Sequence, residues 1–176
     1  NPIESIQSRI KRPYSIAQKL RRRGLPVTVE AIAENLNDVA GIRVICPFIS
    51  DIYAVSEMLQ KQDDVYLIAL KDYIQNPKAN GDRSLHLIVE IPVFFSTEKE
   101  NIRVEVQIRT VAMDFWASLE HQMGYKNDSS DVQQLANELK ECADTIAQTD
   151  RKMQELRERI SQSYKTKTEY RKEIRI

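Results

Sequence analysis

Four polar side chains alternate along one short segment, namely Arg103, Glu105, Gln107 and Arg109. Successive side chains of a β-strand point to opposite faces, so these four would line one face of a sheet. A carboxylate between guanidinium groups could hold a metal ion, or accept a proton beside bound phosphate. A half-exposed structural strand has the same pattern, so the segment alone leaves both interpretations open.

The segment Ser84–Glu90 predicts a second strand with a polar face, made of Ser84, His86 and Glu90. If the two strands are neighbours, their polar faces form a charged cleft. His86 is a weak signal by itself, because a single histidine is as readily structural as functional.

The stretch from Arg9 to Arg23 contains seven basic residues and no acidic one, although the whole chain is neutral with 26 of each. A local cationic patch in a neutral protein suits a small anion better than a long nucleic acid, and a solvated helix face is the alternative. The basic residues are Arg9, Lys11, Arg12, Lys19, Arg21, Arg22 and Arg23.

Phosphoryl transfer needs a metal-holding carboxylate, cations for phosphate oxygens and a base for the attacking hydroxyl. Asp38 and Glu105 offer the carboxylates, and the basic residues of 9–23 and 71–83 offer the cations. The chain has four glycines and no glycine-rich phosphate loop, so side chains would have to hold a nucleotide. These residues favour a reaction at phosphate groups, but they do not identify the substrate.

Helices and strands must position these groups. Pro13 and Gly24 predict a helix over Pro13–Arg23, and Thr28 predicts the N-cap of the next helix. Asp51 predicts the N-cap of a third helix, whose inward residues would be Ile52, Val55, Met58 and Leu59.

Strands are predicted at 40–46, 65–71, 84–90 and 102–110. The loop between the second and third is turn-rich and too short for a crossover helix, so these two should be antiparallel. We therefore expect an α/β (α+β) fold with a mixed, mainly antiparallel sheet of four to five strands flanked by helices.

The chain beyond Thr110 predicts a helix over Val111–Gly124 and a long C-terminal helix from about 131 to 160. We expect its first half to pack on the domain and the charge-rich residues 150–176 to be exposed or at an interface. Its apolar stripe consists of Val132, Leu135, Leu139, Ala143, Ile146, Met153, Leu156 and Ile160.

A chain of 176 residues is long enough for one domain. It has no stretch of the roughly 18 apolar residues that a membrane span needs. The two cysteines, Cys46 and Cys142, provide no disulfide framework, so we expect a reducing, cytoplasmic location and no membrane. Because the chain begins with Asn1, we expect further residues upstream.

Five segments occur in a distinctive order and spacing: 8–20, Asn37–Arg43, Lys71–Lys78, Asn80–His86 and Glu105–Thr110. Together they resemble the synthetase domain of the RelA/SpoT family over roughly 8–124. The short chain is similar to the small, stand-alone alarmone synthetases of that family. The last two segments are specific in combination, whereas either alone would be weak.

The resemblance implies a nucleotidyltransferase-like synthetase domain over 1–124, and a helical extension for packing and oligomerisation over 125–176. The implied activity is that of a GTP diphosphokinase: pyrophosphate moves from ATP to the 3′-hydroxyl of GDP or GTP, giving AMP and the alarmone of the stringent response. Mg²⁺ is the implied cofactor, with Mn²⁺ as an alternative, and a homotetramer is the implied assembly. The chain shows no metal-binding hydrolase domain, so we do not expect it to degrade the product.

Residue roles follow from the same resemblance. Asp38 and Glu105 would be catalytic and would bind the metal, with Glu105 as the base. The ATP site would comprise Arg9 and Arg43, on either side of the adenine, and Lys11, Ser15, Lys19 and Arg22 at the phosphates. The acceptor site would comprise Lys71, Lys78, Asp82, Arg83, His86, Gln107 and Arg109.

Asp82 departs from the family pattern N-G-Y-R-S, in which a tyrosine stacks on the acceptor guanine. An aspartate cannot stack on a base, and its acidic side chain would repel the phosphates of a guanine nucleotide. We therefore expect weak use of guanine nucleotides and a gain in turnover for Asp82→Tyr.

Two alternatives stay open at this point. Toxic relatives place pyrophosphate on the 3′ end of tRNA, although the neutral total charge argues against a tRNA surface. A non-catalytic module that binds nucleotides or single-stranded RNA is the other, and the presence of both Asp38 and Glu105 argues against it.

Overall fold

A mixed sheet of five strands, in the spatial order β1-β2-β5-β4-β3, forms the centre of the computed structural model, which describes residues 1–124 and 132–173. The strands are β1 (Ser5–Ile10), β2 (Ala40–Cys46), β3 (Tyr66–Asp72), β4 (Leu85–Phe94) and β5 (Lys99–Thr110). β2 and β5 are parallel, and the other neighbouring pairs are antiparallel. The predicted fold class is therefore confirmed, including the antiparallel pairing across the short β3–β4 connection.

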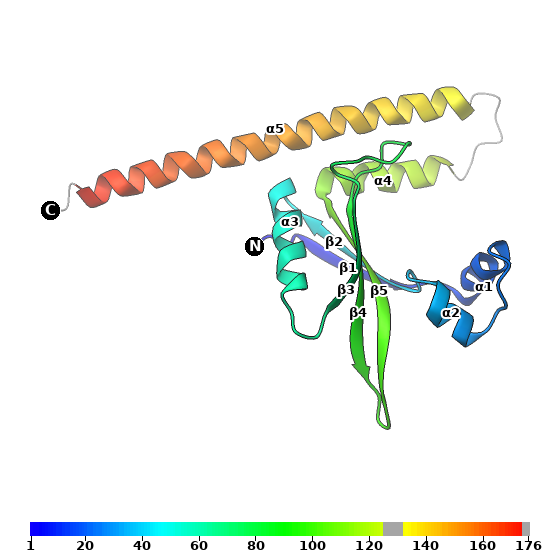
Figure 1. Ribbon diagram of the computed structural model, residues 1–176. Coiled ribbons are helices and arrows are strands. Elements are labelled where there is room, and N and C mark those ends of the chain that lie inside the picture. Colours follow the sequence, from blue (N-terminus) through cyan, green and yellow to red (C-terminus); the bar gives the residue numbers. More distant parts are fainter. Residues whose placement is uncertain (125–131, 174–176) are drawn as a thin grey trace.

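The edge strand β1 is absent from the strands that the sequence predicts. Ile6 and Ile10 share one face of this strand with Ser8. All six residues of the strand are exposed, so this pattern does not mark a buried face. β4 and β5 also continue past their predicted ends as a hairpin, which extends away from the helices at the far end of the sheet (Figure 1).

The described residues form five helices around the sheet: α1 (Pro13–Arg22), α2 (Val29–Asn35), α3 (Ile49–Gln60), α4 (Val111–Gly124) and α5 (Val132–Glu173). The predicted N-cap Thr28 is confirmed, because its hydroxyl oxygen accepts a hydrogen bond from the Ala31 amide at 3.2 Å.

The predicted N-cap Asp51 is wrong. α3 begins at Ile49, and Asp51 lies buried in its first turn, where Arg157 of α5 pairs with it at 2.7 Å. Met58, expected to point inward, is 55% exposed. Aspartate is common both at the N-cap and in the first turn of a helix, where it interacts favourably with the helix dipole. The sequence alone therefore does not distinguish the two positions.

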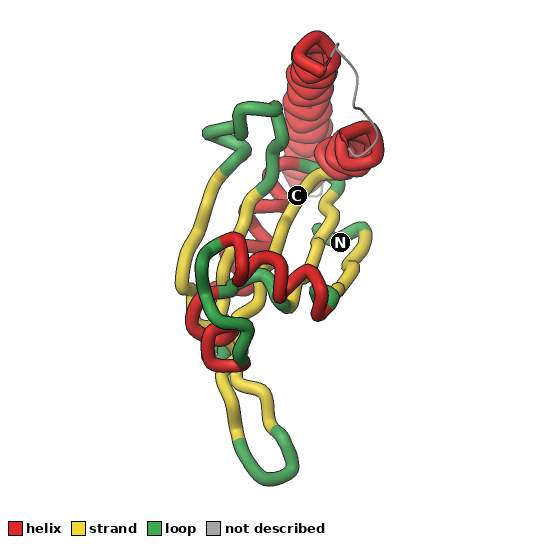
Figure 2. The backbone as a smooth tube through the Cα atoms, turned by 90° about the vertical axis from the view of Figure 1, so that its right-hand side faces the viewer, coloured by secondary structure: helices red, strands yellow, loops and turns green. Residues whose placement is uncertain are grey.

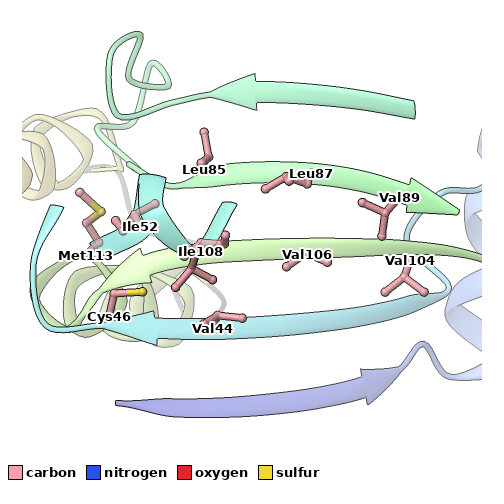
Figure 3. Close-up of a cluster of buried hydrophobic side chains, with 11 residues drawn as sticks. Val44, Cys46, Ile52, Leu85, Leu87, Val89, Val104, Val106, Ile108 and Met113 are labelled. Carbon is pink, nitrogen blue, oxygen red and sulfur yellow. The ribbon is translucent and has the colours of Figure 1, made fainter. Parts of the chain in front are cut away.

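One face of the sheet carries the hydrophobic core (Figure 3). Alternate residues of β2, β4 and β5 point to this face, and Ile52 and Val55 of α3 cover it. Full burial of each such aliphatic side chain is worth about 1.5–3 kcal/mol. The opposite face is left for polar side chains. α1 and α2 have a separate small cluster, built around Ile16 and Leu20.

The described contacts of α5 with the domain come from its middle. It lies beside α4 (Figures 1 and 2) and continues beyond the body of the domain (Figure 1). Ala143 and Ala147 are buried, whereas Val132 is 53% exposed, so the predicted packing of the first half is wrong at its start. With 42 residues α5 is roughly 63 Å long at about 1.5 Å per residue, while α4 has 14 residues and cannot cover it.

The described helices include none that is both long and apolar enough to cross a membrane. The side chains of α5 are described as far as Tyr164. The expected start of the long helix near 131 and the predicted domain boundary at 125 lie outside the described residues, as do the side chains at the end of the predicted charge-rich segment.

The loop between β3 and β4, residues 73–84, is held against α5. Gly81 has φ +92°, and a Cβ added there would lie 2.6 Å from the Ala143 Cβ. Arg83 reinforces the contact, because it donates hydrogen bonds to the Ala143 carbonyl and to Asp144, each at 3.1 Å. The position therefore requires glycine for both its backbone conformation and its closeness to the helix.

Asp150 of α5 is buried where β5 passes into α4. Its carboxylate accepts a hydrogen bond from the Thr110 hydroxyl, whose oxygen accepts one from the Met113 amide and so caps α4. Burial raises the pKa of Asp150, although the Thr110 hydrogen bond opposes this shift. Because the pKa is higher in the folded than in the unfolded state, the stabilisation by the protonated group is lost as the pH rises through the folded-state pKa.

We expect Asp150→Asn, which keeps an acceptor for Thr110 without a charge, to unfold at the same or a higher temperature than the parent at about pH 8. The difference should shrink as the pH falls through the folded-state pKa of Asp150, because the carboxyl group then becomes neutral as well. Asp150→Ala leaves the buried hydroxyl without this acceptor and should lose about 1–3 kcal/mol. Thermal unfolding followed by circular dichroism tests both, and a lower midpoint for Asp150→Asn than for Asp150→Ala would contradict the role of Asp150 as a buried hydrogen-bond acceptor.

Candidate functional site

The polar side chains of neighbouring strands meet in register on the face opposite the core. Gln107 of β5 lies opposite Arg43 of β2 on one side and His86 of β4 on the other, and Lys71 of β3 lies opposite His86. Residues directly opposite each other share a face. The predicted polar face across β4 and β5 is therefore present, and it continues over β2 and β3.

A cleft of about 230 Å³ opens on this face between β1, β2 and β5. Its lining includes Gln7, Arg9, Arg43, Glu105 and Gln107. Two arginines thus stand at the side of the cleft formed by β1 and β2, and the carboxylate of Glu105 stands on β5. The strand missing from the sequence prediction, β1, supplies one wall.

Asp38 lies just before β2 and accepts a hydrogen bond from Lys19 of the basic helix α1. One carboxylate oxygen, Oδ2, accepts hydrogen bonds from Lys11 Nζ at 2.6 Å and Lys19 Nζ at 2.7 Å. Burial raises the pKa of Asp38, but the hydrogen bonds and charges of the two lysines outweigh it, so the pKa is below its usual value. The other oxygen, Oδ1, is buried without a hydrogen-bond partner among the described residues.

Glu105 is held by its neighbours on the polar face. His86 Nδ1 lies 3.3 Å from Oε1, and Gln107 donates a hydrogen bond to Oε2 at 3.0 Å. The hydrogen bond with His86 is the largest cause that lowers the pKa of Glu105, and burial opposes it. The carboxylate is therefore ionised at neutral pH. The other nitrogen of His86, Nε2, is buried with no hydrogen-bond partner in the described part of the chain.

The charge of Asp38 opposes the lowering of the Glu105 pKa and is the smallest of its causes. The described residues contain no group of three or more His, Cys, Asp or Glu side chains that could hold a metal ion. Mg²⁺ usually takes one or two carboxylates and completes its coordination with water and substrate phosphates. The unpartnered Oδ1 of Asp38, with Glu105 nearby, fits a divalent cation that binds together with a nucleotide.

Asp82 is buried at the other end of the polar face, and both of its oxygens are occupied. Oδ1 lies 3.3 Å from Arg109 Nη2, and Oδ2 accepts a hydrogen bond from Lys78 Nζ. Asp82 is therefore a paired carboxylate, and the expected repulsion of the acceptor's phosphates stays a prediction. Its negative charge is compensated by two of the cations that the resemblance assigns to the acceptor.

The remaining predicted residues differ in their placement. Lys71 is exposed on the polar face, and Ser15 and Arg22 lie one turn on either side of Lys19, on the same side of α1 by helical periodicity. The structure does not bring Arg83 to the cleft, because its guanidinium group is bonded to α5.

Sequence reasoning missed two residues that organise the site. Asp114, in the first turn of α4, lies 3.1 Å from Arg43 and 3.7 Å from Arg109. Tyr73 lies edge-on to the His86 ring, with 5.2 Å between ring centroids, and Lys78 Nζ is 4.8 Å from the centroid of its ring. Asp114 gives no sequence signal, since an acidic residue in a first turn is ordinary.

Comparison with known proteins identifies the family to which this chain is similar. Residues 8–130 match the region found in RelA/SpoT proteins. The GTP pyrophosphokinase YwaC of Bacillus subtilis is 50% identical over 153 residues, which are 87% of this chain and 73% of that protein. The GTP pyrophosphokinase YjbM of the same organism is 34% identical over 163 residues, or 93% of this chain and 76% of that protein.

Solved structures have the same fold. Small alarmone synthetase 1 from B. subtilis bound to its product pppGpp has a TM-score of 0.82 and 35% identity, over 91% of this chain and 80% of that chain. Small alarmone synthetase 2 from B. subtilis has a TM-score of 0.82 and 47% identity, over 90% and 83%. The chain belongs to the RelA/SpoT family.

Proposed function

We propose that this chain is a small alarmone synthetase, which transfers pyrophosphate from ATP to the 3′-hydroxyl of GDP or GTP and releases AMP. The observation that carries the proposal is a cleft lined by Arg9, Arg43 and the carboxylate of Glu105. Asp38, just before β2, adds a second carboxylate, which is held by Lys11 and Lys19. The named relatives are GTP pyrophosphokinases, and one related structure was solved with pppGpp.

The donor side of the site is built around α1 and β2. Lys11 and Lys19 bind Asp38 in this structure, and their side chains are about a quarter to a third exposed. They can therefore also contact phosphate oxygens from the solvent side, as Ser15 and Arg22 would on the same face of α1. The flat guanidinium groups of Arg9 and Arg43 suit contacts with both faces of the adenine.

On the acceptor side, Glu105 takes the proton of the attacking hydroxyl. Its lowered pKa keeps it ionised and able to accept a proton at neutral pH, and His86 and Gln107 fix its orientation. His86 is a positioning residue through this contact, and its Nε2 has no hydrogen-bond partner among the described residues. In the imidazolium form Nε2–H can donate a hydrogen bond to an acceptor phosphate oxygen. Lys71, Lys78, Gln107 and Arg109 are the further acceptor-side groups on this face.

Asp38, through Oδ1, and Glu105 are the residues that would hold Mg²⁺, with Mn²⁺ as the alternative. When bound, the ion neutralises charge on the transferred phosphates. Lys11 and Lys19 keep Asp38 ionised and ready to coordinate.

Incubation with labelled ATP and GDP, GTP or tRNA, followed by separation of the products, tests the assignment. Labelled guanosine tetra- or pentaphosphate is expected. Transfer to tRNA alone would identify the alternative acceptor, and the absence of transfer to any of the three would leave a nucleotide- or RNA-binding module.

We expect Glu105→Gln to lower the transfer rate by about 10²–10⁴-fold, because glutamine keeps the shape but cannot accept the hydroxyl proton. ATP binding, measured by calorimetry, should stay close to that of the parent. Glu100→Gln is the matched control, because Glu100 is exposed on the same strand, towards the hairpin end. Retention of more than about a tenth of the rate by Glu105→Gln would remove it from the base role.

Lys19→Ala and Arg22→Ala should each weaken ATP binding, since a charge-assisted contact with phosphate is worth about 1.5–3 kcal/mol. Arg21→Ala is the control, because Arg21 lies on the same helix but on another face from Lys19. Calorimetric ATP affinities equal to the parent's in both test variants would mean that the basic stretch is only a solvated face.

Assembly is proposed from the end of α5, as a homo-oligomer and specifically a tetramer. Met153, Leu156 and Ile160 form an exposed apolar stripe that begins where Gln154 and Arg157 contact α3 and continues one turn further, and their exposed fractions are 49%, 39% and 56%. Light scattering should give a multiple of the 20.4 kDa chain mass, and Ile160→Glu should reduce it. Glu158→Gln, on the same helical turn, should not. A monomer mass for the parent at micromolar concentration would overturn the proposal.

A further inference from the structure

We propose that Asp82 is an internal counter-ion of the acceptor site, which holds Lys78 and Arg109 so that the phosphates of the acceptor nucleotide must compete with its carboxylate. Asp82 would thus set the affinity for the acceptor nucleotide, because its carboxylate pairs with Lys78 and Arg109 and leaves them less available to phosphate. The inference rests on the proposed function, because it concerns the acceptor of that reaction.

The ion pair of Asp82 with Arg109 is shielded from water. Each side chain is only 7% exposed, and Arg109 Nη2 lies 3.3 Å from Oδ1. Lys78 occupies the other oxygen, so the carboxylate has a cation on each side. Breaking a buried pair costs more than breaking a surface pair, because an uncompensated charge is left inside the protein.

The backbone of the loop fixes this arrangement. The Gly81 amide donates to the Lys78 carbonyl at 2.8 Å, and the Lys78 amide donates to the Asp82 carbonyl at 3.2 Å. The Asp82 amide donates to Asn80 Oδ1 at 3.1 Å. Since Gly81 and Arg83 are also held against α5, the carboxylate cannot leave its cations unless the loop itself moves.

The pair is continuous with the cleft. Arg109 also faces Asp114 at 3.7 Å, and Asp114 lies 3.1 Å from Arg43, which lines the cleft. The connected charges are three cations (Lys78, Arg109 and Arg43) and two carboxylates (Asp82 and Asp114), a net charge of one positive. Without the charge of Asp82 the same group would carry two, and its attraction for phosphate would rise.

Lys78 is the cation at which competition takes place. Its side chain is 36% exposed, so a phosphate can reach its ammonium group from solvent, whereas Asp82 approaches from the inside. The Tyr73 ring, 4.8 Å from Nζ, holds the same ammonium group in place. A phosphate must therefore share Lys78 with Asp82 or displace it.

The test separates competition from the lack of an aromatic stack. Asp82→Asn removes the charge but adds no ring, and Asp82→Tyr removes the charge and adds one. Binding of GDP is measured by calorimetry in the presence of a non-hydrolysable ATP analogue, and steady-state kinetics give KM for GDP and for ATP. Thermal unfolding establishes that each variant is folded, and Asp82→Ser replaces Asp82→Asn if the latter is not.

We expect Asp82→Asn to bind GDP about fivefold more tightly or better, because phosphate no longer competes for Lys78. The Lys78–Asp82 pair is partly exposed on the lysine side, and such a pair is worth up to about 1 kcal/mol, which converts to about fivefold. KM for GDP should fall accordingly, with KM for ATP unchanged. Asp144→Asn is the matched control, because it removes an aspartate that pairs with the same loop on its α5 side. It should leave GDP binding unchanged.

Unchanged GDP affinity in Asp82→Asn would overturn the inference, and a gain in Asp82→Tyr alone would assign the whole effect to stacking. Because the binding measurement does not need turnover, its outcome can be distinguished from that of the transfer assay. If Asp82→Asn binds GDP more tightly but no variant transfers pyrophosphate from ATP, the role of Asp82 as a counter-ion is supported and the proposed synthetase activity is contradicted.

Discussion

The in-register pairing of β5 with β2 on one side and β4 on the other is the constraint on which the site depends. It divides the central strands into one apolar face, which α3 covers, and one polar face, which stays open. A shift of one residue in either pairing would turn Glu105 or His86 into the core. The packing of the valines and leucines between them therefore fixes the positions of the charged groups.

The sequence predicts those features that depend on local periodicity. Glu105 and Gln107 share a face because a strand alternates, and Lys19 lies on the inner side of α1 because a helix repeats every 3.6 residues. The contact of His86 with Glu105 follows once β4 and β5 are neighbours. For these residues, the spacing along the chain is sufficient to predict which side chains lie on the same face.

Features that depend on distant contacts could not be predicted in this way. The edge strand β1 buries no residue and has no apolar face to reveal it. The two ion pairs of Asp82 require the docking of loop 73–84 on α5, together with the end of β5, and no short window of sequence contains all three. The family resemblance located the position but suggested repulsion, because the partners of a charge are not visible in a motif.

The contact between Gly81 and Ala143 has a consequence for how such a sequence can vary. With 2.6 Å between the Ala143 Cβ and the place of a Cβ on residue 81, neither position has room for another carbon atom while the other stays as it is. The loop and the helix are thus one steric unit, although they are far apart along the chain. Because the φ of Gly81 also disfavours any side chain, shortening residue 143 would not free position 81 to change. The requirement on α5 at this turn is therefore for a small residue rather than for a hydrophobic one.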